Sequence, residues 1–211
     1  KEFPGIVAND NITLQLKEGE IHALLGENGA GKSTLMGMLF GMYKPDRGCI
    51  KVRGKEVKIS NPNVANDLGI GMVHQHFMLL PSLTVAENVV LGIEPMKNGF
   101  FDFKKAVEMT REVAEKYKFD IDPLMKVADL SVGQMQKVEI MKVLIKGAKI
   151  IIMDEPTAVL TAQETEELFE QLILLRENGH SIIFISHKLE EVKRICTRVT
   201  VLRHGYCLGS Y

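Results

Sequence analysis

The stretch GENGAGKST, residues 26–34, decides the fold class of this chain. It follows the apolar run IHALL at 21–25, which is typical of a buried strand. The glycines of 26–34 let the backbone curl so that successive amides face inward. With the helix that follows, such amides form a nest for phosphate groups, and the lysine of the pattern G-x-x-x-x-G-K-S reaches the β- and γ-phosphates. The candidate nucleotide-binding residues of this loop are Gly26, Glu27, Asn28, Gly29, Ala30, Gly31, Lys32, Ser33 and Thr34.

Two further apolar runs resemble the strand before the loop: KIIIMDE at 149–155 and SIIFISH at 181–187. Continuous apolar runs of this length are typical of parallel strands that are buried on both faces. Ligands bind at the carboxyl ends of the strands in open α/β sheets. We therefore expect the loop to form one site with Asp154, Glu155 and His187, the polar residues near the ends of these runs.

The segments between the runs predict helices. Residues 31–41 and 101–118 carry apolar side chains at helical spacing. Residues 161–179 begin with a capping box formed by Thr161 and Glu164 and end at a glycine. Helices that alternate with buried strands indicate an α/β architecture.

These patterns predict an α/β protein of one domain, 1–211: a P-loop NTPase core with a parallel sheet, a small antiparallel β subdomain and an inserted helical subdomain. The core is expected at about 1–76 and 147–211, and the helical subdomain at about 77–146. The small antiparallel sheet is expected from three segments of strand-like pattern, at 12–20, 49–59 and 199–209. The chain begins and ends within patterned segments, so we expect it to be part of a longer protein.

The composition argues against several classes of protein. The 211 residues include 26 Lys and Arg and 27 Asp and Glu, and a formal net charge of −1 argues against a dedicated nucleic-acid-binding protein. The three cysteines, Cys49, Cys196 and Cys207, lack the spacing of a zinc site or a disulfide framework. No apolar stretch approaches the ~20 residues of a membrane span.

The acidic pair at the end of the second run suits phosphate-transfer chemistry. Asp154 would hold Mg²⁺ through its water shell, and the Ser33 hydroxyl would bind the same ion. Glu155 is placed to orient or deprotonate an attacking water molecule. This set of residues does not by itself separate kinases, GTPases, motors and transport ATPases.

The stretch LSVGQMQKVEI at 130–140 narrows the class. It resembles the L-S-G-G-Q signature of the ATP-binding cassette ATPases of membrane transporters, and it comes shortly before the acidic pair, as in that family. Ser131 would cap a helix, and Gly133 would leave the amides of its first turn unpaired. This helix end could then bind a phosphate. The resemblance implies that Ser131, Gly133 and Gln134 complete the ATP site of a partner cassette.

The same resemblance implies roles for three further residues. Gln75, in VHQHF, would contact Mg²⁺ and the attacking water, His187 would lie at the γ-phosphate, and Phe3 would stack on adenine. The ligands implied are ATP and Mg²⁺. The candidate catalytic residues are then Lys32, Gln75, Glu155 and His187, and the candidate Mg²⁺ ligands are Ser33, Gln75 and Asp154.

The resemblance also implies partners. In this family two cassettes pair head to tail, and transmembrane permease subunits usually dock on the helical subdomain. A location on the cytoplasmic face of the inner membrane follows, as a peripheral protein that binds no nucleic acid.

A finer resemblance is to importers of simple sugars and nucleosides. The stretches 19–36, 71–92 and 154–164 are similar to the first cassette of their two-cassette ATPases, and HQHFML at 74–79 is similar to the nucleoside branch. A substrate-binding lipoprotein usually feeds such importers. The resemblance therefore implies ATP-driven uptake of a nucleoside or simple sugar.

Two residues depart from the wider family pattern. Val132 stands where the signature usually has a glycine, and a β-branched residue with positive φ would be strained, so we predict a negative φ there. Thr161 stands where many cassettes have an aspartate, and we expect it to cap the following helix.

Other classes remain open. The main alternative is a non-transport cassette ATPase that acts on ribosomes or nucleic acid, although such proteins usually carry a basic extension or a long coiled coil. A P-loop kinase or GTPase is disfavoured by the signature stretch and by the absence of an N-K-x-D motif. His74 and His76 flank Gln75, but two histidines without an evident third ligand are poor evidence for a metal site.

Overall fold

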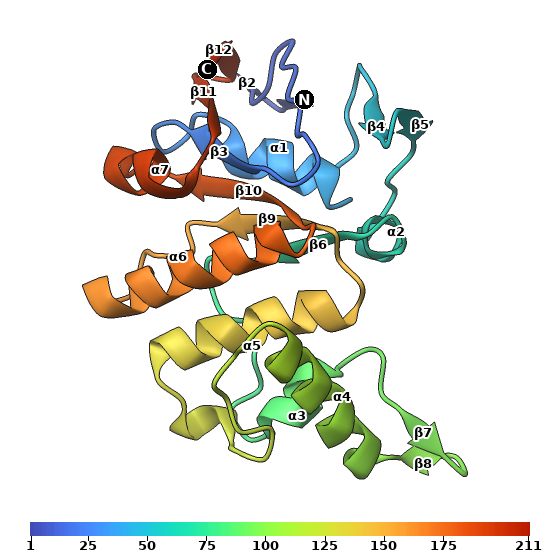
Figure 1. Ribbon diagram of the computed structural model, residues 1–211. Helices are drawn as coiled ribbons and strands as arrows, with labels where there is room; N and C mark the ends of the chain where they lie inside the picture. Colours follow the sequence, from blue (N-terminus) through green and yellow to red (C-terminus); the bar gives the residue numbers. More distant parts are fainter.

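A six-stranded sheet forms the centre of the computed structural model, which describes residues 1–211 (Figure 1). The strand order is β12-β11-β3-β10-β9-β6, and every neighbouring pair is parallel except β11 and β12. The strands are β3 (Ile21–Leu25), β6 (Ile70–Val73), β9 (Ile150–Asp154), β10 (Ser181–Ser186), β11 (Arg198–Arg203) and β12 (Tyr206–Ser210). The three strands expected from the apolar runs are therefore confirmed, and they lie side by side.

Helices cover both faces of this sheet (Figure 1). Alternate residues of β10 pack in opposite directions: Ile183 joins a cluster with Met36 of α1, and Phe184 joins a cluster with Leu172 of α6. The helices are α1 (Lys32–Leu39), α2 (Pro62–Asp67), α3 (Val85–Val89), α4 (Phe103–Lys116), the 3₁₀ turn η1 (Val127–Asp129), α5 (Val132–Ile145), α6 (Ala162–Glu177) and α7 (Leu189–Ile195). The α/β fold class is thus confirmed, with the strands buried on both faces as expected.

Helices α3 and α4 lie beyond α5, away from the sheet (Figure 1). The chain leaves the sheet after β6, builds these helices and returns through α5 to β9. A short hairpin of β7 (Met96–Lys97) and β8 (Phe100–Phe101) interrupts this segment, which the sequence reading expected to be mainly helical. Its turn residues Asn98 and Gly99 both have positive φ (53° and 83°), and such an Asn-Gly pair is a common hairpin signal.

The expected small antiparallel sheet does not form as one unit. Residues 12–20 contain no strand, although Leu14 and Leu16 still pack against the core. The second segment forms an isolated hairpin of β4 (Ile50–Val52) and β5 (Lys55–Val57). The third segment forms β11 and β12, and β11 joins the main sheet because it pairs in parallel with β3.

The expected helix starts are confirmed where the chain provides a capping side chain. Thr161 and Glu164 form the capping box of α6, as the sequence predicts. Ser131 caps α5, and Gln134 completes a second box there. The N-terminal strands β1 (Glu2–Phe3) and β2 (Ile6–Val7) form a hairpin beside the core. None of the helices combines the length and the apolar composition that crossing a membrane requires.

Candidate nucleotide-binding site

The glycine-rich loop joins β3 to α1, and two of its glycines are required by close packing. A Cβ atom at Gly31 would lie 2.3 Å from the carbonyl oxygen of Ala8, and one at Gly26 would lie 2.5 Å from that of Leu202. Gly31 also has φ 98°, a left-handed conformation that favours glycine. The close approach of these two carbonyl oxygens leaves no room for a side chain at either position.

The curled loop leaves an anion site at the start of α1. No side chain caps this helix, and the amides of Lys32, Ser33 and Thr34 have no acceptor within the chain. Lys32 is buried, and its Nζ atom donates to the carbonyl oxygens of Gly26 (2.7 Å) and Glu27 (3.0 Å). Unpaired amides at a helix N-terminus beside a lysine attract phosphate groups.

Asn9 supports the loop from outside, a contact that sequence reasoning missed. The residue is 5% exposed, and its Nδ2 atom donates to the Gly31 carbonyl oxygen at 3.0 Å. The Gly205 amide likewise donates to the Ala30 carbonyl oxygen at 3.1 Å. No local motif points to Asn9, because its role depends on a chain segment folded back against the loop.

The strand register brings the acidic pair to the loop. Leu25 pairs with Ser186, and Asp154 pairs with Ile185, so β3, β9 and β10 end at one edge of the sheet. The loop, Asp154, Glu155 and His187 therefore meet there, as expected from the parallel strands.

Asp154 is a half-buried carboxylate without a hydrogen bond or ion pair in the chain. Burial, and then the neighbouring Glu155 carboxylate, raise the pKa of Asp154 above its ordinary value, while His74 and Lys32 act in the opposite direction. A desolvated carboxylate of this kind suits a bound cation.

Glu155 has an unusual backbone conformation for a residue with a side chain. Its φ is 46°, in the left-handed region, and its amide donates to the Ile185 carbonyl oxygen at 3.1 Å. Its Oε1 atom lies 3.3 Å from Nδ1 of His187. Left-handed conformations of this kind cluster at functional sites.

The oxygen donors available near this edge fit Mg²⁺. They are the Asp154 carboxylate, the exposed Ser33 hydroxyl at the start of α1 and the exposed Gln75 side chain, two residues beyond β6. Mg²⁺ prefers oxygen ligands and retains several waters, so a few protein oxygens suffice. His74 packs edge-on against Phe40, and no group of three or more His, Cys, Asp or Glu side chains converges as a metal site.

Phe3, the candidate adenine-stacking residue, lies in β1, a few residues before Asn9. Its ring packs edge-on against Tyr43 at a centroid distance of 5.4 Å, and Lys1 Nζ lies 5.3 Å from its centroid. Its role toward adenine remains a prediction.

The signature stretch lies at the start of α5, where the amides of Ser131, Gly133 and Gln134 already make hydrogen bonds. Ser131 Oγ accepts from the Gln134 amide at 3.2 Å, and the Gly133 amide donates to Oε1 of Glu164 at 2.9 Å. The expectation that Gly133 leaves bare amides was wrong, because α6 brings a carboxylate to this helix end. Val132 begins α5 without a positive φ, as predicted.

The chain by itself does not join the signature to the phosphate-binding loop. The hydrogen-bond partners of Ser131, Gly133 and Gln134 lie within this stretch or on α6. One chain therefore contributes two separate groups of candidate residues: the loop with the acidic pair and His187, and the signature.

The loop, the acidic pair and the α/β sheet define a P-loop nucleotide-binding protein. The family model for the ABC transporter matches residues 9–158. The chain belongs to the ABC transporter family, in which it forms an ATP-binding cassette.

Similar proteins and structures agree with this assignment. The guanosine import ATP-binding protein NupO of Bacillus subtilis (strain 168) is 60% identical over 97% of this chain and 40% of its own length. The nucleoside import ATP-binding protein NupA of Lactococcus lactis subsp. cremoris (strain MG1363) is 51% identical over 100% of this chain and 42% of its own. The ADP conformation of MJ1267, an ATP-binding cassette of an ABC transporter, superposes with a TM-score of 0.88 at 27% identity, covering 100% of this chain and 87% of that one. The chain thus spans about two fifths of the length of these curated relatives.

Proposed function

We propose that this chain is the first cassette of the ATP-hydrolysing subunit of an importer for a nucleoside or a simple sugar. The convergence of the phosphate-binding loop with Asp154, Glu155 and His187 at one edge of the sheet carries the ATPase part of this proposal. The names of the relatives, which include guanosine and nucleoside import proteins, support the cargo.

The residues of the loop bind and orient the triphosphate. The free amides at the start of α1 hold phosphate oxygens, and Lys32 exchanges its two carbonyl partners for the β- and γ-phosphates. Ser33, Gln75 and Asp154 would hold Mg²⁺, which neutralises charge on the phosphates when bound.

Glu155 and His187 act on the attacking water. The Glu155 carboxylate accepts a proton as the water oxygen bonds to the γ-phosphorus and the bond to the β-phosphate oxygen breaks, which yields ADP and phosphate. His187 lies close enough to hold this carboxylate in place, and its role at the γ-phosphate is part of the same proposal.

A second cassette completes each site. The signature residues Ser131, Gly133 and Gln134 make no hydrogen bond to the chain's own loop, which supports a role toward nucleotide held by a partner cassette. Since the chain covers about two fifths of its relatives' length, a tandem cassette in the longer chain is the natural partner.

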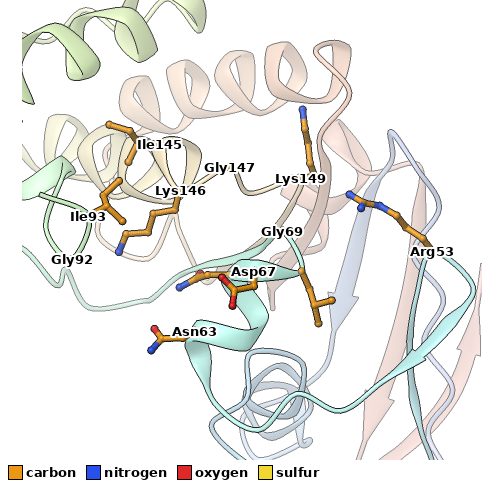
Figure 2. Close-up of a pocket in the computed structure, with 12 residues that line it drawn as sticks. Arg53, Asn63, Asp67, Gly69, Gly92, Ile93, Ile145, Lys146, Gly147 and Lys149 are labelled. Atoms are coloured by element: carbon orange, nitrogen blue, oxygen red, sulfur yellow. The ribbon is translucent and has the colours of Figure 1, made fainter. Parts of the chain in front are cut away.

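The permease docks where the core meets the helical segment. We place the boundaries of that segment at about residues 77 and 146. A cavity of about 680 Å³ opens there, lined by Asp67 and Gly69 from the core side and by Ile93 and Lys146 from the helical side (Figure 2). Burial, and then Lys142, lower the pKa of Lys146. The cavity lies at the amino-terminal ends of β6 and β9, opposite the edge where the phosphate-binding loop lies. In the proposed function the protein works as a peripheral protein on the cytoplasmic face of the membrane, and the substrate-binding lipoprotein acts only through the permease.

Reconstitution tests the proposal. The full-length subunit, its permease and its lipoprotein are placed in vesicles, and ATP-dependent uptake of labelled guanosine and of labelled ribose is measured, with Lys32→Ala as the inactive control. Uptake of either cargo that requires ATP and Lys32 supports the proposal. Absence of uptake, with ribosomes or nucleic acid as the partners recovered from cells, would favour the non-transport alternative.

A further inference from the structure

The carboxylate of Glu164 occupies the phosphate-facing end of the signature helix. Its Oε1 atom accepts from the Gly133 amide at 2.9 Å and lies 3.4 Å from Ser131 Oγ. The fit is close, since a Cβ atom at Gly133 would lie 2.7 Å from this oxygen.

The other carboxylate oxygen of Glu164 is held by its own helix. Oε2 accepts from the Thr161 amide and from Thr161 Oγ1, each at 3.0 Å. Hydrogen bonds from the Thr161 and Gly133 amides lower the pKa of Glu164, so the side chain is charged at neutral pH. A negatively charged group is therefore fixed where the proposed function requires a γ-phosphate to arrive.

A phosphate and this carboxylate cannot both use the same donors. The single N–H of Gly133 points at one acceptor, and two anionic oxygens at hydrogen-bond distance from it would repel each other in a partly desolvated interface. A γ-phosphate on a partner cassette must then displace Oε1 of Glu164 before it reaches the signature.

We propose that Glu164 is an internal competitor of the γ-phosphate: it holds the signature donors in the open cassette and is released only when a triphosphate closes the pair. This inference rests on the proposed function, because it needs the signature to act on a partner's nucleotide. ADP lacks a γ-phosphate that could compete with Glu164. After hydrolysis, the Glu164 carboxylate therefore favours separation of the two cassettes.

A purely structural role predicts a different pattern. Glu164 could simply tie α6 to α5, as Glu167 does one turn later through a 2.8 Å ion pair with Lys137. Glu167 links the two helices without a hydrogen bond to Ser131, Gly133 or Gln134, which makes Glu167→Gln a matched control. Glu164→Gln removes the charge but keeps the capping box, since Gln serves equally at this position.

The experiment uses the full-length protein with one fluorophore on each cassette. Closure is followed by energy transfer while AMP-PNP, which has a γ-phosphate and resists hydrolysis, is titrated with Mg²⁺. Binding of ADP is measured in parallel, and thermal melting reports on folding. We expect Glu164→Gln to lower the half-saturating AMP-PNP concentration about fivefold, the effect of weakening one charge-assisted contact, with ADP affinity unchanged. Glu167→Gln should change neither.

Each other outcome has a defined meaning. An unchanged or increased half-saturating AMP-PNP concentration in Glu164→Gln overturns the competitor role, and so does an equal effect of Glu167→Gln. A wild-type protein that does not close with AMP-PNP rejects the proposed function itself, independently of Glu164.

Discussion

Oε1 of Glu155 and Nδ1 of His187 lie 3.3 Å apart, although 32 positions separate them along the chain. The pair exists because β9 and β10 are parallel neighbours that end at the same edge. Glu155 adopts a left-handed φ of 46°, which costs about 1 kcal/mol for a residue with a side chain, and the surrounding sheet maintains it. Strain held in this way is consistent with selection for the position of the carboxylate.

Glu155→Gln should separate binding from turnover. The amide keeps the size and polarity of the side chain but accepts no proton from water, so ATP hydrolysis should fall at least about 100-fold while ATP affinity changes little. Steady-state phosphate release by the full-length protein with its permease, beside equilibrium ATP binding, measures both quantities. Turnover at the wild-type rate would exclude Glu155 as the general base.

Asp154→Asn should stabilise the fold and impair Mg²⁺-dependent nucleotide binding. Folding raises the pKa of Asp154, so the folded state disfavours the carboxylate. This group therefore contributes stability below its unfolded pKa, near 3.8, and loses it as pH rises through the higher folded pKa. At pH 7 the neutral amide should raise Tm by about 2 °C, and the difference should shrink as pH falls toward 4.

Thermal melting at several pH values, with and without Mg²⁺ and ATP, checks this prediction. Mg²⁺ with ATP should raise the Tm of the wild type more than it raises the Tm of Asp154→Asn. A lower Tm of the variant at pH 7 without ligand would show that the carboxylate has a stabilising partner.

Gly31→Ala should destabilise the protein more than Gly29→Ala. Both glycines have positive φ (98° and 81°), so both substitutions introduce backbone strain. At Gly31 the new Cβ atom would also lie 2.3 Å from the Ala8 carbonyl oxygen, whereas nothing lies within 4 Å of one at Gly29. We expect losses of about 3 and about 1 kcal/mol in the free energy of unfolding, measured by urea denaturation. Equal losses would mean that the loop relaxes without cost.

The cysteines should differ in reactivity. Burial raises the pKa of the Cys196 thiol to about 12, while Cys49 is exposed. Because the thiolate is the reactive form, iodoacetamide at pH 8 should modify Cys196 at least about 100-fold more slowly than Cys49. Peptide mass spectrometry over time measures both rates, and Cys49→Ser should remove the fast one. Comparable rates would indicate that the end of α7 opens readily.

Local chemistry in the sequence determined much of this protein. The continuous apolar runs predicted β3, β9 and β10, the capping box of Thr161 and Glu164 predicted the start of α6, and the residues 26–34 predicted the loop. Each feature depends on side chains within a few positions of one another, so it can be predicted from the local sequence.

Tertiary structure decided what depends on distant segments. Residues 12–20 have a strand-like pattern but find no partner strand, whereas β11 joins the main sheet because β3 offers a free edge. The support of the loop by Asn9 and the carboxylate of Glu164 on the signature follow from chain segments brought together by folding, 22 and 31 positions apart. Hydrogen bonds across such separations depend on strand order and helix packing, which periodicity and capping do not encode.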